Sequence, residues 1–90
     1  MRELIRTAQF KKDWKRVGNS GKYQINDFLL VVEKLLNDMS LDSKCRDHEL
    51  SGNWSGFMEC HIKPDWLLIY KKEPDQLVLV RTGSHSELFD

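Results

Sequence analysis

Two of the three histidines in this chain stand beside side chains that could share their chemistry. The stretch ECHIKPDW contains His61 and Asp65, and the stretch RTGSHSELF contains Arg81 and His85. Imidazoles titrate near neutrality, so one can remove a proton while another donates one. An arginine beside them can stabilise the extra negative charge of a phosphoryl transition state. Such a set suffices for cleavage of RNA without a metal, because the 2′-hydroxyl attacks its own phosphate.

Each candidate residue also has an ordinary structural role. The third histidine, His48 in RDHEL, can pair with a neighbouring acid, and Asp65 follows a proline at a position that favours turns. Trp66 is more often a core residue than a platform, although it or Phe89 could stack on a nucleobase. The rival chemistry is a zinc site, but the spacing of the histidines and Asp65 matches no compact metal motif. We therefore expect no metal and no other cofactor.

Size and composition favour one small intracellular domain. The chain has 90 residues, 40% of them hydrophobic, which is enough for a single core over residues 1–90. No apolar stretch is long enough to cross a membrane, and the N-terminus lacks the apolar region of a secretory signal. Cys45 and Cys60 form no CxxC pair, which is typical of reduced thiols. We expect a cytoplasmic protein without a membrane partner.

The formal net charge is zero, yet the basic residues gather near the N-terminus. Residues 1–22 contain seven Lys and Arg against Glu3 and Asp13, so this segment carries 7 − 2 = +5 and the rest of the chain −5. A basic segment on a neutral protein fits a surface that faces a polyanion. It fits an ordinary solvated helix as well.

Hydrophobic periodicity predicts the N-terminal elements. A strand is expected over residues 2–9, followed by a short helix with Phe10, Trp14 and Val17 on one face and Gly18 at its end. A longer amphipathic helix is expected over residues 24–39. Its apolar stripe consists of Ile25, Phe28, Leu29, Val32, Leu35, Leu36 and Met39.

After residue 56 the pattern changes to the period of two that strands show. FMECHIK, WLLIYKK and LVLVRT are joined by tight turns, which predicts an antiparallel meander, and HEL at 48–50 adds a short strand before it. If Met58, Cys60 and Ile62 face the helices, His61 points to the open face of the sheet. Parity alone does not fix the face of Arg81. The predicted fold is α+β, with the order β-α-α-β-β-β-β and two N-terminal helices packed on one face of a small antiparallel-rich sheet.

Three segments, RDHELSGNWSGF, ECHIKPDWLLIY and RTGSHSELF, closely resemble the YafQ-like branch of the RelE/ParE superfamily of bacterial toxins. The likeness covers residues 46–89, and the first half agrees in layout. The resemblance implies a RelE-like fold and a metal-independent messenger-RNA endonuclease, an mRNA interferase of a type II toxin–antitoxin system. Such a toxin acts in the ribosomal A site, inhibits translation and is neutralised by a co-expressed antitoxin.

The resemblance also implies a role for individual residues. Those assigned to proton transfer and orientation are His48, His61, Asp65 and His85. Those assigned to substrate binding are Arg81, Trp66 and Phe89. We expect His85 to be the general acid for the leaving 5′-hydroxyl, and either Asp65 or His48 to be the base. Arg81 would hold the scissile phosphate, and Phe89 would help to place the base or the neighbouring catalytic groups.

Two other functions on the same fold stay open. One is a ParE-like toxin that poisons DNA gyrase, and the other is an inactive member that binds its antitoxin and helps to repress the shared operon. The implied partners are a cognate antitoxin, messenger RNA, ribosomal RNA and operator DNA contacted through the antitoxin. Toxins of this branch are usually distinctly basic, whereas this chain is neutral. We therefore expect residues 2–22 to supply the contact with ribosomal RNA.

Overall fold

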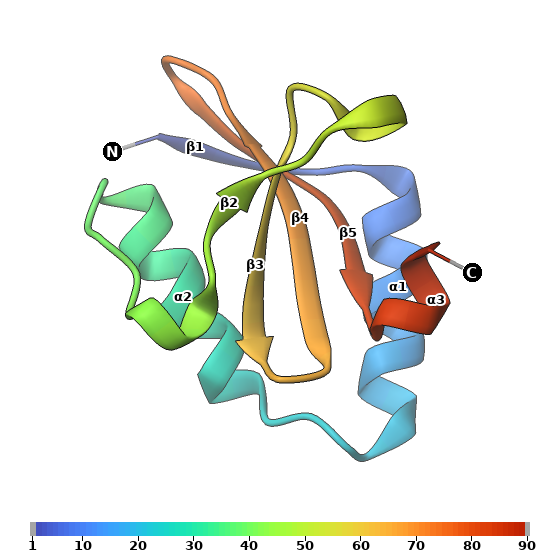
Figure 1. Ribbon diagram of the computed structural model, residues 1–90. Helices are drawn as coiled ribbons and strands as arrows, with labels where there is room; N and C mark the ends of the chain where they lie inside the picture. Colours follow the sequence, from blue (N-terminus) through green and yellow to red (C-terminus); the bar gives the residue numbers. More distant parts are fainter. Residues whose placement is uncertain (1, 90) are drawn as a thin grey trace.

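A single five-stranded sheet forms the centre of the computed structural model, which describes residues 2–89 (Figure 1). The strand order is β1-β5-β4-β3-β2, with β1 parallel to β5 and the other neighbours antiparallel. The strands are β1 (Glu3–Arg6), β2 (His48–Glu49), β3 (Met58–Lys63), β4 (Trp66–Lys72) and β5 (Gln76–Gly83). The sheet confirms the predicted α+β class and the antiparallel meander.

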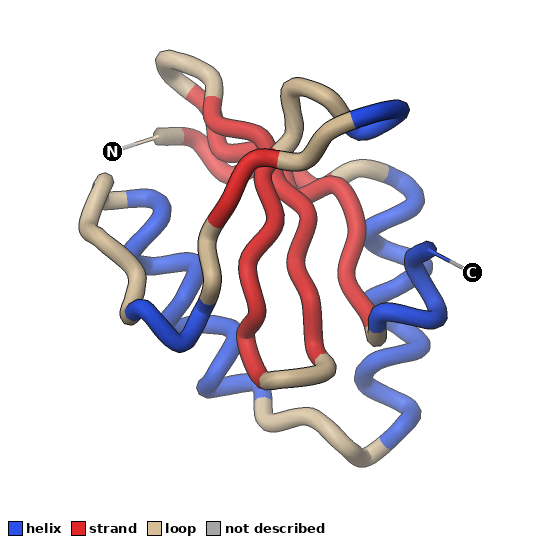
Figure 2. The backbone as a smooth tube through the Cα atoms, viewed as in Figure 1, coloured by secondary structure: helices blue, strands red, loops and turns tan. Residues whose placement is uncertain are grey.

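Helices flank the sheet. Two long helices, α1 (Ala8–Ser20) and α2 (Ile25–Leu36), cover one face, and a short helix, α3 (His85–Phe89), follows the end of β5 (Figures 1 and 2). Two 3₁₀ turns, η1 (Ser43–Cys45) and η2 (Gly52–Trp54), lie on either side of β2 in the chain. Helix α3 was not predicted from the sequence. Within residues 2–89, no helix has both the length and the apolar character needed to cross a membrane.

The ends of α1 differ from the prediction. Thr7 caps its N-terminus, with Oγ1 accepting a hydrogen bond from the Phe10 N–H at 3.0 Å, so β1 stops at Arg6. The prediction that Gly18 ends the helix is wrong, because α1 continues to Ser20 and Gly21 follows in the left-handed region at φ 71°. A glycine adopts that conformation without steric cost, which makes Gly21 the natural C-terminal signal.

The buried face of α2 is rotated relative to the predicted stripe. Phe28, Val31, Val32 and Leu35 are buried, which is the i, i+3, i+4, i+7 spacing of one helical face. Ile25, Leu29 and Met39 were predicted to be buried but are more than half exposed, at 56%, 51% and 55%. The helix also ends at Leu36, so Met39 lies beyond it.

Apolar side chains pack on both faces of the sheet. The larger cluster joins α1 and α2 to the strands, and Cys60 and Ile62 belong to it as the parity of β3 predicted. The smaller cluster contains Leu67 and Ile69 of β4 and Leu88 of α3. The face expected to be open is therefore partly covered by α3.

A β-bulge in β5 decides where Arg81 points. Ile69 pairs with Arg81 whereas Tyr70 pairs with Leu79, so Val80 is an extra residue in the ladder. Simple alternation would place Arg81 on the face of Leu79, which packs against the helices. The extra residue reverses the alternation, and Arg81 instead stands opposite Ile69, on the face that α3 partly covers.

Candidate functional site

Two predicted histidines flank one buried carboxylate. β2 pairs with β3 so that His48 lies opposite Glu59. The Nε2 atoms of His48 and His61 lie 3.4 and 3.9 Å from the same oxygen, Glu59 Oε1. Glu59 is 6% exposed, which places its negative charge between the two rings and away from bulk water. The carboxylate therefore faces the Nε2 atoms of both imidazole rings.

Hydrogen bonds fix the orientation of both rings. Nδ1 of His48 lies 2.6 Å from the carbonyl oxygen of Arg46, and Nδ1 of His61 lies 3.2 Å from that of Pro64. A carbonyl oxygen only accepts, so each Nδ1 carries the proton and donates. In the neutral state each Nε2 then keeps its lone pair beside Glu59. Both rings are therefore oriented to receive a proton at Nε2.

Sequence reasoning missed Glu59, although a signal was present. Glu59 and His61 alternate with the core residues of β3, so they share one face. A carboxylate at a strand position flanked by two core residues is unusual unless it has a partner. The partner, His48, comes from a strand of only two residues, and its register with β3 could not be read from the pattern.

Asp65 and His85 meet where the β3–β4 turn approaches α3. Oδ1 of Asp65 accepts a hydrogen bond from the backbone N–H of His85 at 3.2 Å. The imidazole of His85 is exposed and lies 5.2 Å from the Phe89 ring, measured between centroids, one helical turn further on. Phe89 in turn meets the ring of Trp54 edge-on at 6.4 Å. The predicted pair His85 and Phe89 thus forms one continuous surface.

The two histidines around Glu59 and the pair of Asp65 and His85 lie in one region of the molecule. His61 bonds to Pro64, and the adjacent Asp65 holds the backbone of His85. Across the β3–β4 ladder, His61 stands opposite Leu67, which packs in the same cluster as Leu88 of α3. The predicted residues His48, His61, Asp65, His85 and Phe89 are therefore linked by neighbouring contacts on one face of the sheet.

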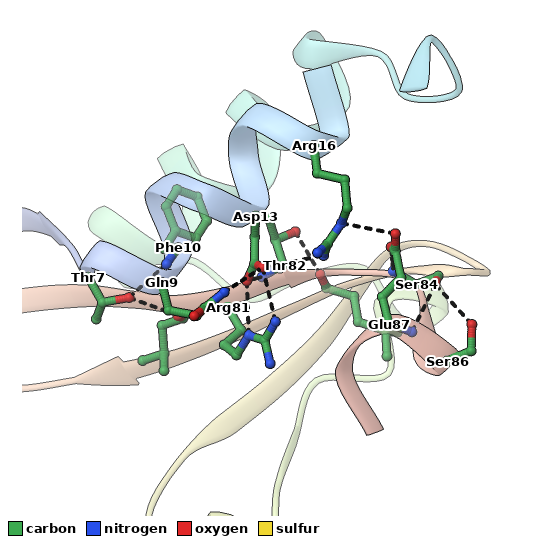
Figure 3. A network of polar contacts seen from close by, with 12 residues as sticks. Thr7, Gln9, Phe10, Asp13, Arg16, Arg81, Thr82, Ser84, Ser86 and Glu87 are labelled. Atoms are coloured by element: carbon green, nitrogen blue, oxygen red, sulfur yellow. Dashed lines mark hydrogen bonds and ion pairs between the residues drawn. The ribbon is translucent and has the colours of Figure 1, made fainter. Parts of the chain in front are cut away.

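Arg81 reaches the same face and is held by a buried acid. Its Nε and Nη2 atoms donate to Oδ2 and Oδ1 of Asp13 at 3.0 Å each (Figure 3). The side chain of Arg81 is 22% exposed, and within residues 2–89 its Nη1 amino group has no hydrogen-bond partner. The hydrogen bonds to Asp13 raise the pKa of the Arg81 guanidinium. The group is permanently charged and keeps one free amino group for an anion.

The structure contradicts the prediction that Trp66 binds substrate. Trp66 is 0% exposed and packs in the cluster beneath α1 and α2. Its Nε1–H donates to Oγ1 of Thr82 at 2.9 Å. As the first residue of β4 it shares the helix-facing side with Leu68 and Tyr70, because successive side chains of a strand alternate. A ring with no accessible surface cannot stack on a nucleobase.

No group of three or more His, Cys, Asp or Glu side chains among residues 2–89 is arranged to hold a metal ion. Cys45 and Cys60 are buried and free, on the helix side of the sheet. The chemistry available at this face is proton transfer by imidazole and carboxylate, combined with anion binding by Arg81.

Known proteins are similar to this chain in sequence and in fold. A family model described as the bacterial toxin of type II toxin–antitoxin system, YafQ, matches residues 2–90. The mRNA interferase toxin YafQ of Escherichia coli strain K12 is 35% identical over 89 residues, which cover 98% of this chain and 96% of that protein.

Solved structures agree over the whole chain. A metal-bound toxin from Helicobacter pylori superposes with a TM-score of 0.91 at 40% identity, covering 99% of this chain and 100% of the other. The toxin of the E. coli DinJ–YafQ toxin–antitoxin complex superposes with a TM-score of 0.89 at 34% identity, covering 99% and 98%. The full-length agreement extends the likeness to the first half of the chain, where the sequence segments carried little.

Proposed function

This chain belongs to the YafQ family of bacterial toxins of type II toxin–antitoxin systems, and we propose that it is a metal-free messenger-RNA endonuclease that acts on the ribosome. It is an mRNA interferase by family. One observation supports the mechanism above all others, namely the placement of His48 and His61 around Glu59 on the face where Asp65 holds the start of α3. The proposed mechanism uses imidazole, carboxylate and guanidinium groups for every step and calls for no metal.

The general base acts on the 2′-hydroxyl of the nucleotide before the scissile bond. Asp65 and His48 were both candidates, and the contacts favour His48 because Asp65 is engaged by the His85 backbone. Nε2 of His48 removes the proton, and Glu59 stabilises the resulting imidazolium at 3.4 Å. Nε2 of His61 lies 3.9 Å from the same oxygen, so it is placed to accept a relayed proton.

The general acid acts on the leaving 5′-oxygen. As the 2′-oxygen forms its bond to phosphorus, the bond from phosphorus to the 5′-oxygen breaks, and His85 supplies the proton that this oxygen needs. The products are a 2′,3′-cyclic phosphate and a 5′-hydroxyl. The exposed imidazole at the start of α3 suits this role, with Phe89 beside it as a stacking surface for a base. Nη1 of Arg81 binds a non-bridging phosphate oxygen while the charge develops.

The pH dependence of cleavage tests this assignment of acid and base. A base that must be neutral and an acid that must be protonated give a bell-shaped profile of kcat/KM. His85→Ala should remove the alkaline limb and lower the rate by about 10²–10⁴-fold, the usual contribution of such a group. Glu59→Gln should lower the rate and leave the alkaline limb unchanged, because the carboxylate that faces Nε2 of His48 is lost. A His85→Ala profile with both limbs intact would overturn the assignment.

Ribosomal RNA contacts the basic face of α1 in this proposal. Lys11, Lys12 and Lys15 are exposed, line one surface hollow together with Arg6, and form no ion pair within residues 2–89. Unpaired cations on one helix are suited to phosphate contacts, which dominate affinity for nucleic acids. This local excess of positive charge provides a basic surface, although the net charge of the whole chain is zero.

Charge reversal tests the ribosomal contact. Replacing Lys11, Lys12 and Lys15 by Glu should abolish co-sedimentation with ribosomes. The matched control reverses Lys34, Lys44 and Lys72, which lie on α2, η1 and β4, and should leave co-sedimentation unchanged. Equal ribosome binding by the α1 variant and the wild type would remove α1 from the interface.

The same family membership supports a proposal for the partners. The E. coli relative is solved as a complex with DinJ. We propose that this chain binds a cognate antitoxin of its own, that it meets messenger RNA in the ribosomal A site of the cytoplasm, and that it contacts operator DNA through the antitoxin. Co-expression of the antitoxin should suppress growth arrest and cleavage together. Growth arrest without cleavage would favour the gyrase-directed alternative, and neither effect would favour the inactive co-repressor.

A further inference from the structure

Asp13 is a fully buried acid on the most basic helix of the protein. Its exposed fraction is 0%, whereas Lys11, Lys12 and Lys15 around it are exposed. A carboxylate is buried in this way only when charged and polar groups compensate the loss of water. In the sequence, Asp13 is one of two acids in the basic segment of residues 1–22, and no motif marks it.

Hydrogen bonds to both carboxylate oxygens of Asp13 provide that compensation (Figure 3). Arg81 donates twice, and the backbone N–H of Thr82 donates to Oδ2 at 3.2 Å. Gln9 Nε2 and Arg16 Nη2 donate to Oδ1 at 3.1 and 3.3 Å. Asp13 therefore binds two consecutive residues of β5, Arg81 and Thr82, next to the β-bulge of that strand.

The double contact fixes the guanidinium of Arg81 in one plane. Two parallel N–H···O bonds to a carboxylate define both the position and the orientation of an arginine, which a single contact does not. With Nε and Nη2 engaged at 3.0 Å, the Nη1 edge is directed away from Asp13. That edge is the part of Arg81 left for a phosphate.

The contacts between Asp13 and Arg81 also stabilise the charged form of each side chain. Burial raises the pKa of Asp13, but the hydrogen bonds from Arg81, Gln9 and Thr82 outweigh it, so the pKa lies below its usual value. The hydrogen bonds from Arg81 to Asp13 also raise the pKa of the guanidinium. Both groups are ionised throughout the pH range in which histidines exchange protons.

We propose that Asp13 is a positioning residue for RNA cleavage, which acts by holding the guanidinium of Arg81 so that its Nη1 edge faces the scissile phosphate. This inference rests on the proposed function, in which Arg81 binds that phosphate. Asp13 itself touches neither the substrate nor the reacting atoms. Its effect is on the rate of the chemical step, because displacing a charged group by about 1 Å can cost on the order of 100-fold.

Asp13→Asn is the decisive variant. The amide keeps the size of the side chain but offers one acceptor oxygen, and its NH₂ group opposes a donor of Arg81. We expect single-turnover cleavage on programmed ribosomes to slow by about 10–100-fold, with little change in ribosome affinity. Gln9→Ala is the matched control, because it removes one donor to Asp13 and leaves Arg81 bound. Its cleavage rate should stay within about twofold of the wild type.

A double-mutant cycle separates positioning from mere support of the fold. If Asp13 acts through Arg81, the double variant Asp13→Asn with Arg81→Ala cleaves as slowly as Arg81→Ala alone. Losses that multiply, or a wild-type rate for Asp13→Asn, would overturn the inference. A wild-type rate for Arg81→Ala would instead refute the role of Arg81 in the proposed function.

A second variant keeps the test valid if Asp13→Asn unfolds. Arg81→Lys preserves the charge but cannot make the two parallel contacts, so it should lose activity as Asp13→Asn would, while Asp13 stays ionised and paired. Full activity in Arg81→Lys would show that the orientation set by Asp13 is not needed, and the inference would fail. Circular dichroism at the assay temperature identifies which variants are folded.

Discussion

Thr82→Val is the substitution for which the structure makes its sharpest energetic prediction. Thr82 is 0% exposed, and its hydroxyl makes two hydrogen bonds. Oγ1 accepts from Nε1–H of Trp66 at 2.9 Å and donates to the carbonyl oxygen of Leu67 at 2.8 Å. Valine has nearly the same shape, so the change deletes one hydroxyl from a packed core and leaves the volume intact.

The expected cost is that of a buried donor without a partner. Leaving the indole N–H unsatisfied costs about 1–3 kcal/mol. Burying the added methyl in place of the hydroxyl offsets up to about 0.8 kcal/mol. Losing the second bond, to Leu67, adds about 1 kcal/mol. The net destabilisation is therefore about 2 kcal/mol, which for a chain of this length lowers Tm by about 8–16 °C.

Urea unfolding followed by tryptophan fluorescence and circular dichroism measures this loss. The midpoint should fall while the slope m stays unchanged, because the same surface is exposed on unfolding. In a Trp66→Phe background the donor is absent, so Thr82→Val should cost clearly less there. A loss below about 0.5 kcal/mol in the wild-type background would mean that the Trp66–Thr82 bond does not hold β4 to β5.

Three further predictions concern the backbone, acid stability and thiol reactivity. Gly83 has φ 154°, and a Cβ there would lie 3.0 Å from two charged side-chain atoms, so Gly83→Ala should lower the free energy of unfolding by about 1–3 kcal/mol. Gly18 has open space around it inside α1, so Gly18→Ala should raise stability by about 0.5–1 kcal/mol; the opposite order would contradict the geometry. The pKa of Asp13 is lowered on folding, so its contribution to stability is complete above its unfolded pKa of about 3.9 and is lost as pH falls through the folded value. Asp13→Asn should flatten the acid limb of stability against pH, and an unchanged limb would exclude Asp13 as its source. Burial raises the pKa of Cys60, which is 0% exposed, so thiol reagents should label it no faster than the protein unfolds. Rapid labelling of native Cys60 would contradict that burial.

Long-range periodicity made much of the fold predictable. The three strands of the meander and the second helix follow from patterns that extend over six or more residues. The predictions were wrong where the end of a helix or its buried face depends on a single residue. Gly21 adopts the left-handed conformation that ends α1. The sequence alone did not distinguish it from Gly18, because both glycines fit the spacing. Val31 is buried in α2, whereas Ile25 and Leu29 are exposed. Hydrophobicity alone does not distinguish these three apolar side chains.

The site was predictable in its residue types and not in its geometry. The side of β5 on which Arg81 lies depends on the extra residue Val80, and no sequence signal marks that bulge. The grip of Asp13 on Arg81 joins residues 68 positions apart and needs the packing of α1 on β5. Trp66 looked available beside Asp65, but alternation along β4 turns it into the core. Contacts across elements, rather than motifs, decided each of these outcomes.

Cleavage of a defined messenger by metal-stripped protein tests the central proposal most directly. The toxin is treated with EDTA, desalted and added to programmed ribosomes in magnesium buffer, with phenanthroline present to capture transition metals, beside His85→Ala prepared in the same way. We predict full cleavage by the wild type only when ribosomes are present, and a loss of about 10²–10⁴-fold in the variant. Activity that returns only after a transition metal is added, or a His85→Ala variant as fast as the wild type, would contradict the metal-free acid–base mechanism.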